Sequence, residues 1–267
     1  MPTARASGEP DIHYETRGEG PPLLLVSGTG HDRTFWSGQS PLFEPEFRVI
    51  VFDNRGVGRS GVPRPGYTLA DMADDAARVL DAAGAESAHV MGFSMGGHIS
   101  QELCLRHPRR VRSLGLHHTW TRNCACLGSF QAARKRLAER GEREALVELS
   151  LLGLYSHAYW DAHAAEMEKK RRWLSVESPV DEGWIGQLEA CLTSDTLERL
   201  GGIRVPTLIT ASTHDLIMGT HQAGEIHRRI PGSRLVIMEG TGHVALIERP
   251  EAFGRICLGF LREVRDL

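Results

Sequence analysis

The stretch Ala88-His89-Val90-Met91-Gly92-Phe93-Ser94-Met95-Gly96-Gly97 decides how this chain folds. Its apolar start predicts a buried strand and residues 97–107 predict a helix, so G-x-S-x-G lies at a strand-to-helix turn. A serine on so sharp a turn projects above the sheet. A side chain two residues before or after Ser94 would collide with the neighbouring strand or helix, which explains Gly92 and Gly96. Gly97 gives the helix room to lie close to the sheet. A glycine-rich turn without chemistry is the alternative, and the strand-to-helix context favours Ser94 as a nucleophile.

Composition excludes several classes of protein. The chain has 267 residues, a net charge of −3, 41% hydrophobic and 24% charged residues, which is typical of a globular α/β protein. We expect no nucleic-acid partner, because there is no basic excess, and no membrane partner, because no apolar run approaches ~20 residues. The N-terminus lacks the order of a signal peptide, so we expect a cytoplasmic protein.

The cysteines predict neither a disulfide framework nor a metal site. There are five of them, an odd number, and they are scattered along the chain. Cys124 and Cys126 form C-x-C, but no matching second pair follows, so the pattern does not indicate a zinc site. Free thiols in a reducing compartment fit this pattern best, and no metal or organic cofactor is expected.

The rest of the chain alternates between strand and helix patterns. After a short N-terminal hairpin, continuous apolar runs predict buried strands at 23–26, 48–52, 88–91, 111–116, 206–211 and 234–238. Amphipathic helices are predicted between them, one of which begins at Thr68 with Asp71 three residues later, a capping pattern. This alternation predicts a mostly parallel, doubly wound α/β sheet.

Residues 119–200 break the alternation. They contain no buried-strand pattern, and helical periods occur instead at 130–140, 143–152, 159–174 and 182–192. We therefore predict a core of residues 1–118 and 201–267 and an all-helical cap of residues 119–200. The pocket is expected between cap and sheet, lined by aromatic side chains of the cap.

A serine nucleophile needs a base and an acid that orients the base. Reacting groups of a parallel sheet gather where its strands end. Asp215 follows one predicted strand and His243 follows the last, so Ser94, Asp215 and His243 stand in a triad order known for serine hydrolases. His117 and His118 also end a strand, but no strand and acid follow them in the required order. Asp195 is a weaker acid candidate, since we expect it within a helix.

Hydrolysis also needs hydrogen-bond donors for the oxyanion that develops during the reaction. The amide of Met95 is the first candidate, because it lies at the start of the helix after Ser94. The second should come from the loop after the first buried strand, Gly28-Thr29-Gly30, and we choose the Thr29 amide. An ordinary glycine turn is the alternative for this loop.

These residues closely resemble the α/β-hydrolase superfamily over nearly the whole chain. Two further motifs agree, Asp53-x-Arg55-Gly56-x-Gly58-x-Ser60 and Gly242-His243-x-x-x-x-Glu248-x-Pro250. The resemblance implies an α/β-hydrolase fold with an inserted cap. One departure is Ser27-Gly28, where the family usually has His-Gly. The donor at that place is a backbone amide, so the change need not abolish activity, but it could reshape the pocket.

Within the superfamily the chain resembles the 3-oxoadipate enol-lactonases and the aminoacrylate hydrolases. The second subgroup is suggested by Ser27-Gly28-x-Gly30 and by cap residues that include Phe130, Arg134 and Leu154-Tyr155. Candidate substrate contacts are His31, Trp36, His118, Trp120 and Arg122, and Arg122 could bind a substrate carboxylate. Each of these five has a structural role as its alternative.

The sequence therefore predicts a serine hydrolase of small-molecule esters or lactones. C–C bond hydrolysis and cofactor-free perhydrolysis use the same triad and stay open, as does a small-molecule receptor that keeps the fold without turnover. A scaffold or inactive subunit would predict a lost triad residue, and none is lost. The expected partner is a small-molecule substrate. The oligomeric state, a homodimer included, stays open.

Overall fold

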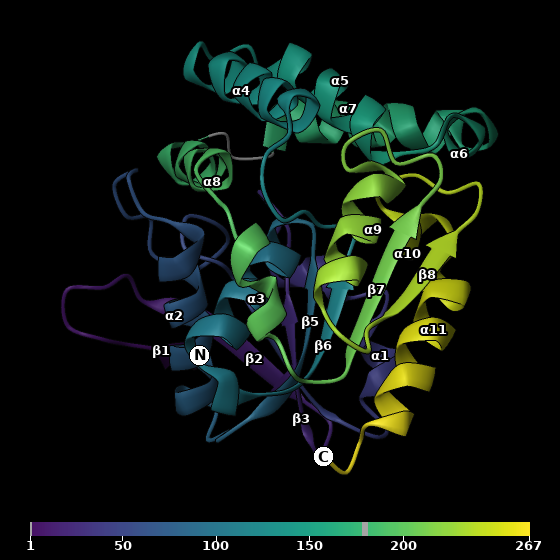
Figure 1. Ribbon diagram of the computed structural model, residues 1–267. Coiled ribbons are helices and arrows are strands. Elements are labelled where there is room, and N and C mark those ends of the chain that lie inside the picture. The colour runs from purple at the N-terminus through teal and green to yellow at the C-terminus, as the bar shows by residue number, and fades with distance from the viewer. Residues whose placement is uncertain (1, 178–180) are drawn as a thin grey trace.

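A computed structural model describes residues 2–177 and 181–267. In this part of the chain, eight strands form one sheet in the order β1-β2-β4-β3-β5-β6-β7-β8 (Figure 1). Their bounds are β1 Thr3–Ala4, β2 Ile12–Arg17, β3 Pro22–Val26, β4 Arg48–Phe52, β5 Ala88–Phe93, β6 Val111–His117, β7 Thr207–Ser212 and β8 Arg234–Met238. The first two pairings, β1 with β2 and β2 with β4, are antiparallel, and the others are parallel. This confirms the predicted doubly wound sheet and N-terminal hairpin.

The core consists of two apolar layers, one on each face of the sheet. Leu24 and Val26 of β3 belong to the layer that also contains the apolar faces of α2 (Leu69–Ala82), α3 (Met95–Arg106) and α9 (Gly219–Arg229). Leu23 and Leu25 face the other way, toward α1 (Ser40–Phe43) and α11 (Pro250–Glu263). Because successive side chains of a strand point to opposite faces, a strand buried on both needs the continuous apolar run seen in the sequence.

Local signals define several helix ends. The predicted capping box of α2 is present, with Thr68 accepting from the Asp71 amide and Asp71 from the Thr68 amide. The last helix, α11, is separate from the short helix α10 (Ala245–Glu248). Arg249 separates the two helices with a non-helical backbone, φ −136° and ψ 61°, and Pro250 starts α11 as a first helical residue that needs no amide donor.

Helices α4–α8 lie at the end of the sheet toward which the β7 and β8 arrows point (Figure 1). They are α4 Ala125–Glu139, α5 Arg143–Leu154, α6 His157–Ala162, α7 Ala164–Glu177 and α8 Glu182–Leu192, followed by the 3₁₀ helix η3 Leu197–Gly202. No sheet strand comes from the described residues between 119 and 200. The division into core and cap stays a prediction, and the position of these helices supports it.

Two of the predicted helices in this segment were wrong in detail. α4 begins five residues before the predicted start, because the Cys124 side chain caps it by accepting from the Leu127 amide. The predicted helix 159–174 is two helices, α6 and α7, that meet at His163. Ser156 caps α6 through the Tyr159 amide, a start signal within a periodic stretch that the pattern alone does not reveal.

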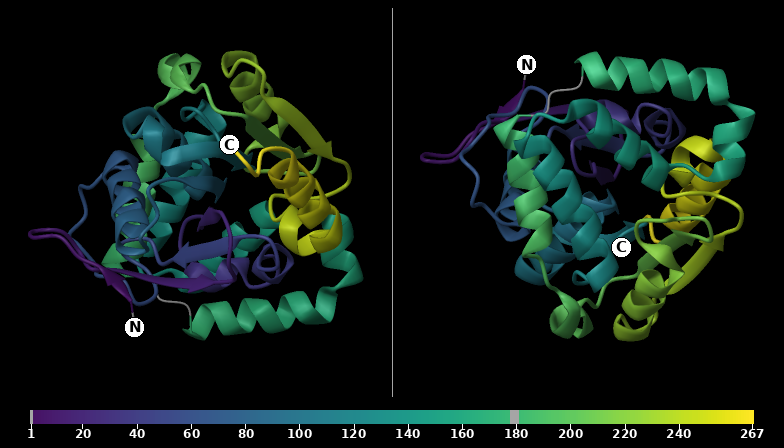
Figure 2. Two further views of the ribbon diagram at one scale, coloured as in Figure 1. Left: turned by 90° about the horizontal axis from the view of Figure 1, so that it is seen from below. Right: turned by 90° about the horizontal axis from the view of Figure 1, so that it is seen from above.

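Views from below and above show the N-terminal hairpin projecting at one side of the molecule and α11 at the other (Figure 2). Two further short 3₁₀ helices are η1 (Arg33–Trp36) and η2 (Pro108–Arg110). Within residues 2–177 and 181–267, none of the helices has both the length and the apolar character needed to cross a bilayer. All five cysteines are free thiols, and Cys104, Cys191 and Cys257 are buried.

Candidate active site

Ser94 occupies a strained turn between β5 and α3. Its φ of 55° lies in a region that side-chain-bearing residues rarely adopt. A Cβ at Gly92 would approach the Gly96 carbonyl oxygen to 2.2 Å, and one at Gly96 would approach the Val26 carbonyl oxygen to 2.1 Å. These contacts confirm the steric reason for both glycines. At Gly97 a Cβ would instead meet the Thr119 side chain at 2.6 Å, so this glycine admits the loop after β6.

Asp215 and His243 come together from the loops after β7 and β8. His243 Nδ1 lies 2.8 Å from Asp215 Oδ2, and because a carboxylate can only accept, Nδ1 carries the proton and donates. The other carboxylate oxygen accepts from the amides of Ile217 and Met218, both at 2.9 Å. These bonds fix the carboxylate and leave Nε2 of His243 as the ring's acceptor.

The ionised form of Asp215 is favoured although the residue is buried. Burial by itself raises the pKa of this carboxyl group, but the charge and hydrogen bond of His243 and the Met218 amide outweigh it. The pKa of Asp215 therefore lies below its usual value. Held by this carboxylate through Nδ1, the ring of His243 can take up a proton at Nε2 without losing its orientation.

The loop after β3 is anchored on both sides. The Ser27 hydroxyl donates to the Asp32 carbonyl at 3.1 Å, so the residue that replaces the family's usual histidine closes this loop. Gln187 of α8 accepts from the Gly30 amide at 2.8 Å and donates to the Arg55 carbonyl at 2.9 Å. Among the described residues, no backbone carbonyl accepts from the amides of Thr29 or Met95.

His31 helps to fix the Thr29 peptide from the pocket side. Its Nδ1 donates to the Thr29 carbonyl at 3.0 Å, which leaves Nε2 as an acceptor. Burial, reinforced by the positive charges of Lys170 and Arg134, lowers the pKa of His31 to about 4. His31 is therefore neutral at physiological pH.

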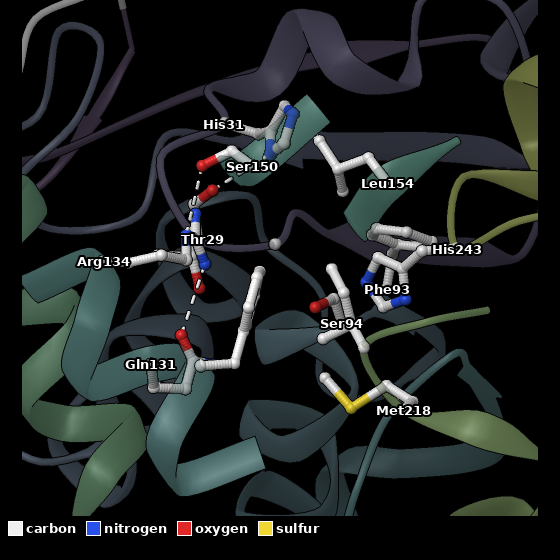
Figure 3. A pocket seen from close by; sticks show the side chains of 13 residues that line it. Thr29, His31, Phe93, Ser94, Gln131, Arg134, Ser150, Leu154, Met218 and His243 are labelled. Carbon is white, nitrogen blue, oxygen red and sulfur yellow. Dashed lines mark hydrogen bonds between the residues drawn. The ribbon is translucent and has the colours of Figure 1, made fainter. Parts of the chain in front are cut away.

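A pocket with an empty volume of about 400 Å³, its open mouth included, joins Ser94 and His243 to the helices above the sheet (Figure 3). Its lining comes from three places: the turns of the sheet, the loop after β7, and helices α4 and α5. The lining residues are Gly28, Thr29, His31, Phe93, Ser94, Phe130, Gln131, Arg134, Ser150, Leu154, Ile217, Met218 and His243. Phe130 is the one aromatic residue that the 119–200 segment contributes to this lining, so the expectation of an aromatic cap lining was wrong.

Of the five predicted substrate contacts, only His31 lines this pocket. Trp36 is fully buried in the core, beside Phe35. Trp120 is equally buried and its indole donates to Ser194 at 3.1 Å. Both large rings therefore have the structural role that the sequence analysis gives as the alternative to substrate binding.

His118 and Arg122 also lie away from the pocket. His118 is buried behind His243, with ring centroids 5.9 Å apart and its Nε2 bonded to the Ser212 hydroxyl at 2.8 Å. Arg122 is exposed, and its backbone pairs with Asp195. Asp195 is therefore not helical as expected, and this exposed carboxylate instead accepts from the Leu197 amide.

Sequence reasoning missed Phe93 at the end of β5, Ile217 and Met218 after β7, and the pocket residues on α4 and α5. Phe130, Gln131 and Arg134 are spaced i, i+1 and i+4, which places them on one face of a helix. In the sequence, Phe130 and Arg134 support only the subgroup resemblance. The spacing was a usable signal, but which face turns toward the sheet is decided by how α4 packs.

The motifs at residues 53–60 and 242–250 position the loops around the site. Buried Asp53 accepts from the amides of Arg33 and Arg59, both at 2.8 Å. Glu248 accepts from the Ser156 amide and hydroxyl, both at 2.7 Å, and from the Gly242 amide at 3.2 Å. Glu248 therefore links the loop that carries His243 to the start of α6.

Within the described residues, no three His, Cys, Asp or Glu side chains form a group that could hold a metal ion.

Comparisons with known proteins agree with this geometry. The curated protein provisionally named carbamate hydrolase RutD from Azorhizobium caulinodans is 35% identical over 99% of both chains. A protein of the same name from Variovorax paradoxus is 31% identical over 95% of this chain and 97% of its own.

Solved structures are similar over almost the full length. The enol-lactonase from Burkholderia xenovorans LB400 superposes with a TM-score of 0.89 at 28% identity, covering 98% of this chain and all of its own. A malate-bound thermophilic esterase from Thermogutta terrifontis has a TM-score of 0.87 at 30% identity, covering 99% and 98%. The family model of the alpha/beta hydrolase fold matches residues 21–250. The chain belongs to the α/β-hydrolase family and is a hydrolase.

Proposed function

We propose that this enzyme hydrolyses small-molecule esters or lactones through an acyl-enzyme on Ser94. The observation that supports this most strongly is the bonded pair of His243 and Asp215, at 2.8 Å, in a pocket that Ser94 also lines. A serine hydroxyl is a weak nucleophile until a base accepts its proton, and an oriented imidazole is such a base.

In the proposed reaction, His243 Nε2 takes the proton of Ser94 as the serine oxygen attacks the carbonyl carbon. Asp215 holds the ring in the required tautomer and stabilises the imidazolium. The amides of Thr29 and Met95 donate to the oxyanion. His243 then protonates the leaving oxygen, and a water molecule, activated by the same imidazole, releases the acid and restores Ser94.

A carbamate is a second candidate substrate. It is favoured by the name of the curated relatives, which match this chain over 99% and 95% of its length. The attack on a carbamate carbonyl uses the same three residues and the same oxyanion donors, so the substrate panel has to separate the two classes.

The test is intact mass after treatment with a fluorophosphonate, combined with turnover of a short p-nitrophenyl ester, a set of small lactones and a small carbamate. We expect one adduct and hydrolysis in the wild type, and neither in Ser94→Ala. Loss of the nucleophile typically lowers kcat by ~10⁶-fold. Ser129→Ala, an exposed serine on α4, is the matched control and should retain both.

No adduct and no turnover in the folded wild type would contradict the proposal and favour the receptor alternative. A receptor would be stabilised by its ligand without consuming it, which a thermal shift with the same compounds would detect. Turnover of a carbamate with inert esters and lactones would select the second candidate. Turnover that survives in Ser94→Ala would exclude Ser94 as the nucleophile.

A further inference from the structure

Arg134 lies in the pocket without an acidic partner. Among the described residues, no carboxylate forms an ion pair with its guanidinium, and the pocket lining contains neither Asp nor Glu. Its partners are neutral: Nε donates to the Ser150 hydroxyl at 3.3 Å, and Nη1 donates to Gln131 Oε1 at 3.2 Å (Figure 3). A cation removed from bulk water without a counter-ion is costly, and proteins rarely keep one without a use.

The plane of the guanidinium is fixed by aromatic rings. Its central carbon lies 5.4 Å from the centroid of Phe130 and 4.9 Å from that of Trp184. Ser150 accepts from Nε and Gln131 accepts from Nη1, and the two lie on opposite sides of the group in Figure 3. Among the described residues, none accepts a hydrogen bond from Nη2. The Nη1–Nη2 edge therefore keeps donors for a ligand, at the spacing that suits the two oxygens of a carboxylate.

Two cations, Arg134 and Lys170, act electrostatically on His31 in the pocket lining. Burial lowers the pKa of this group to about 10, so it stays charged at neutral pH. Lys170 of α7 contributes a second positive charge, felt at His31, and its ammonium donates to the neutral Tyr155 hydroxyl at 2.5 Å. The carboxylate of Asp215 is already paired with His243. Because the pocket lining contains no Asp or Glu, an anionic ligand would be attracted to Arg134 without repulsion from a lining carboxylate.

We propose that Arg134 binds a free carboxylate of the substrate, so that the enzyme selects small esters or lactones that carry a second, ionised acid group. The inference rests on the proposed function for its substrate class, but the anion site itself does not require turnover. The chemistry assigned at sequence level to Arg122 thus belongs to an arginine twelve residues further on, because Arg134 lines the pocket and Arg122 does not.

The experiment compares two esters with the same five-carbon acyl chain, mono-p-nitrophenyl glutarate and p-nitrophenyl pentanoate. They differ only in a terminal carboxylate or methyl group. We expect the wild type to prefer the acidic ester in kcat/KM, after spontaneous hydrolysis is subtracted. Arg134→Gln should lower the acid-to-neutral ratio by roughly 10- to 100-fold, the usual weight of a hydrogen bond to a charged group. Arg134→Lys, which keeps the charge without the paired donors, should give an intermediate ratio.

The matched control is Arg136→Gln, which removes the same charge from an exposed position on the same helix. It should leave the ratio at the wild-type value. An unchanged ratio in Arg134→Gln, with both esters hydrolysed, would overturn the inference and leave the proposed function standing. An equal fall in Arg136→Gln would also overturn it, since net charge rather than a subsite would then explain the preference.

Binding of glutarate, measured by calorimetry on the Ser94→Ala protein with and without Arg134→Gln, separates the two proposals. If the wild type hydrolyses neither ester, the proposed function fails, and the calorimetry alone decides the subsite. A dissociation constant at least tenfold weaker without Arg134 supports the anion site. Equal binding, or no binding with Arg134 present, overturns it. Unfolding temperatures of all variants show whether any loss reflects a damaged fold.

Discussion

At the scale of single residues, the candidate site depends on groups whose environments fix one orientation each. Ser94 is held at a φ of 55° by a turn in which neighbouring backbone leaves no room for side chains at Gly92 and Gly96. Asp215 is bonded by two amides and one imidazole. Such a carboxylate can set the tautomer of His243 because it has no freedom to turn away.

The first prediction concerns that tautomer. Asp215→Asn retains an oxygen for the Ile217 and Met218 amides but presents an NH₂ group to His243. The ring should then place its proton on Nε2 and lose its ability to accept from Ser94. We expect kcat to fall on the order of 10⁴-fold, as the same change does in a serine protease triad, with little change in the unfolding temperature.

Steady-state kinetics on an accepted ester would measure this effect. Asp195→Asn, an exposed carboxylate in the same chain, is the matched control and should keep wild-type kcat. A comparable loss in both variants, or none in Asp215→Asn, would contradict the role proposed for Asp215.

At the scale of elements, α8 connects two loops of the sheet to the helices above it. Gln187 is fully buried and bonds the Gly30 amide of one loop and the Arg55 carbonyl of the other. The Thr29 amide lies in the first of these loops. The orientation of a proposed oxyanion donor therefore depends on a helix far away in sequence.

We predict that Gln187→Leu loosens this loop and lowers kcat by about tenfold. Losing an oxyanion donor altogether typically costs ~2.7–4 kcal/mol in barrier, and a loosened donor should lose part of that. The two backbone groups left unbonded should also lower the free energy of unfolding by about 1–3 kcal/mol each if they stay dry.

The measurement is kcat and KM for one ester together with urea unfolding. Glu182→Gln, exposed in the first turn of α8, is the control and should behave as the wild type. Reduced stability with an unchanged kcat would show that Gln187 only supports the fold and does not position the Thr29 amide.

At the scale of the whole molecule, four histidines with strongly lowered pKa values make stability depend on pH. Burial lowers the pKa of His31 to about 4, and lowers those of His98, His117 and His118 to about 3. In the unfolded chain all four return to about 6.5. Between pH 6.5 and 4 the unfolded state therefore binds more protons than the folded state, so stability rises with pH across this window.

We predict that the free energy of unfolding begins to fall as the pH drops below about 6.5. Each of the four histidines contributes a slope of up to about 1.4 kcal/mol per pH unit. Urea midpoints at half-unit steps from pH 8 to pH 4 would measure it. Paired carboxylates also destabilise in acid, but only near and below their unfolded pKa of about 4. Midpoints that stay flat down to pH 4.5 would contradict the prediction.

Secondary structure is predictable from the sequence where its signal is local and complete. The runs at 23–26 and 88–91 predicted doubly buried strands correctly, because burial on both faces leaves an uninterrupted apolar signature. The capping box at Thr68 was equally readable, since it is completed within four residues. The break between α6 and α7 was missed, because a cap inside a continuous helical period carries a weak local signal.

The sequence by itself determined the sheet, the family and the chain order of Ser94, Asp215 and His243, because strand burial and sharp turns impose strict local demands. Only the tertiary structure decided the lining of the pocket. Arg134 reaches it because of the face that α4 turns toward the sheet, and Arg122 does not, because it lies before α4 and its backbone pairs with Asp195. Whether Trp36 or His118 contacts a ligand depends on what packs over them. Those are outcomes of long-range packing, which no short stretch of the chain encodes.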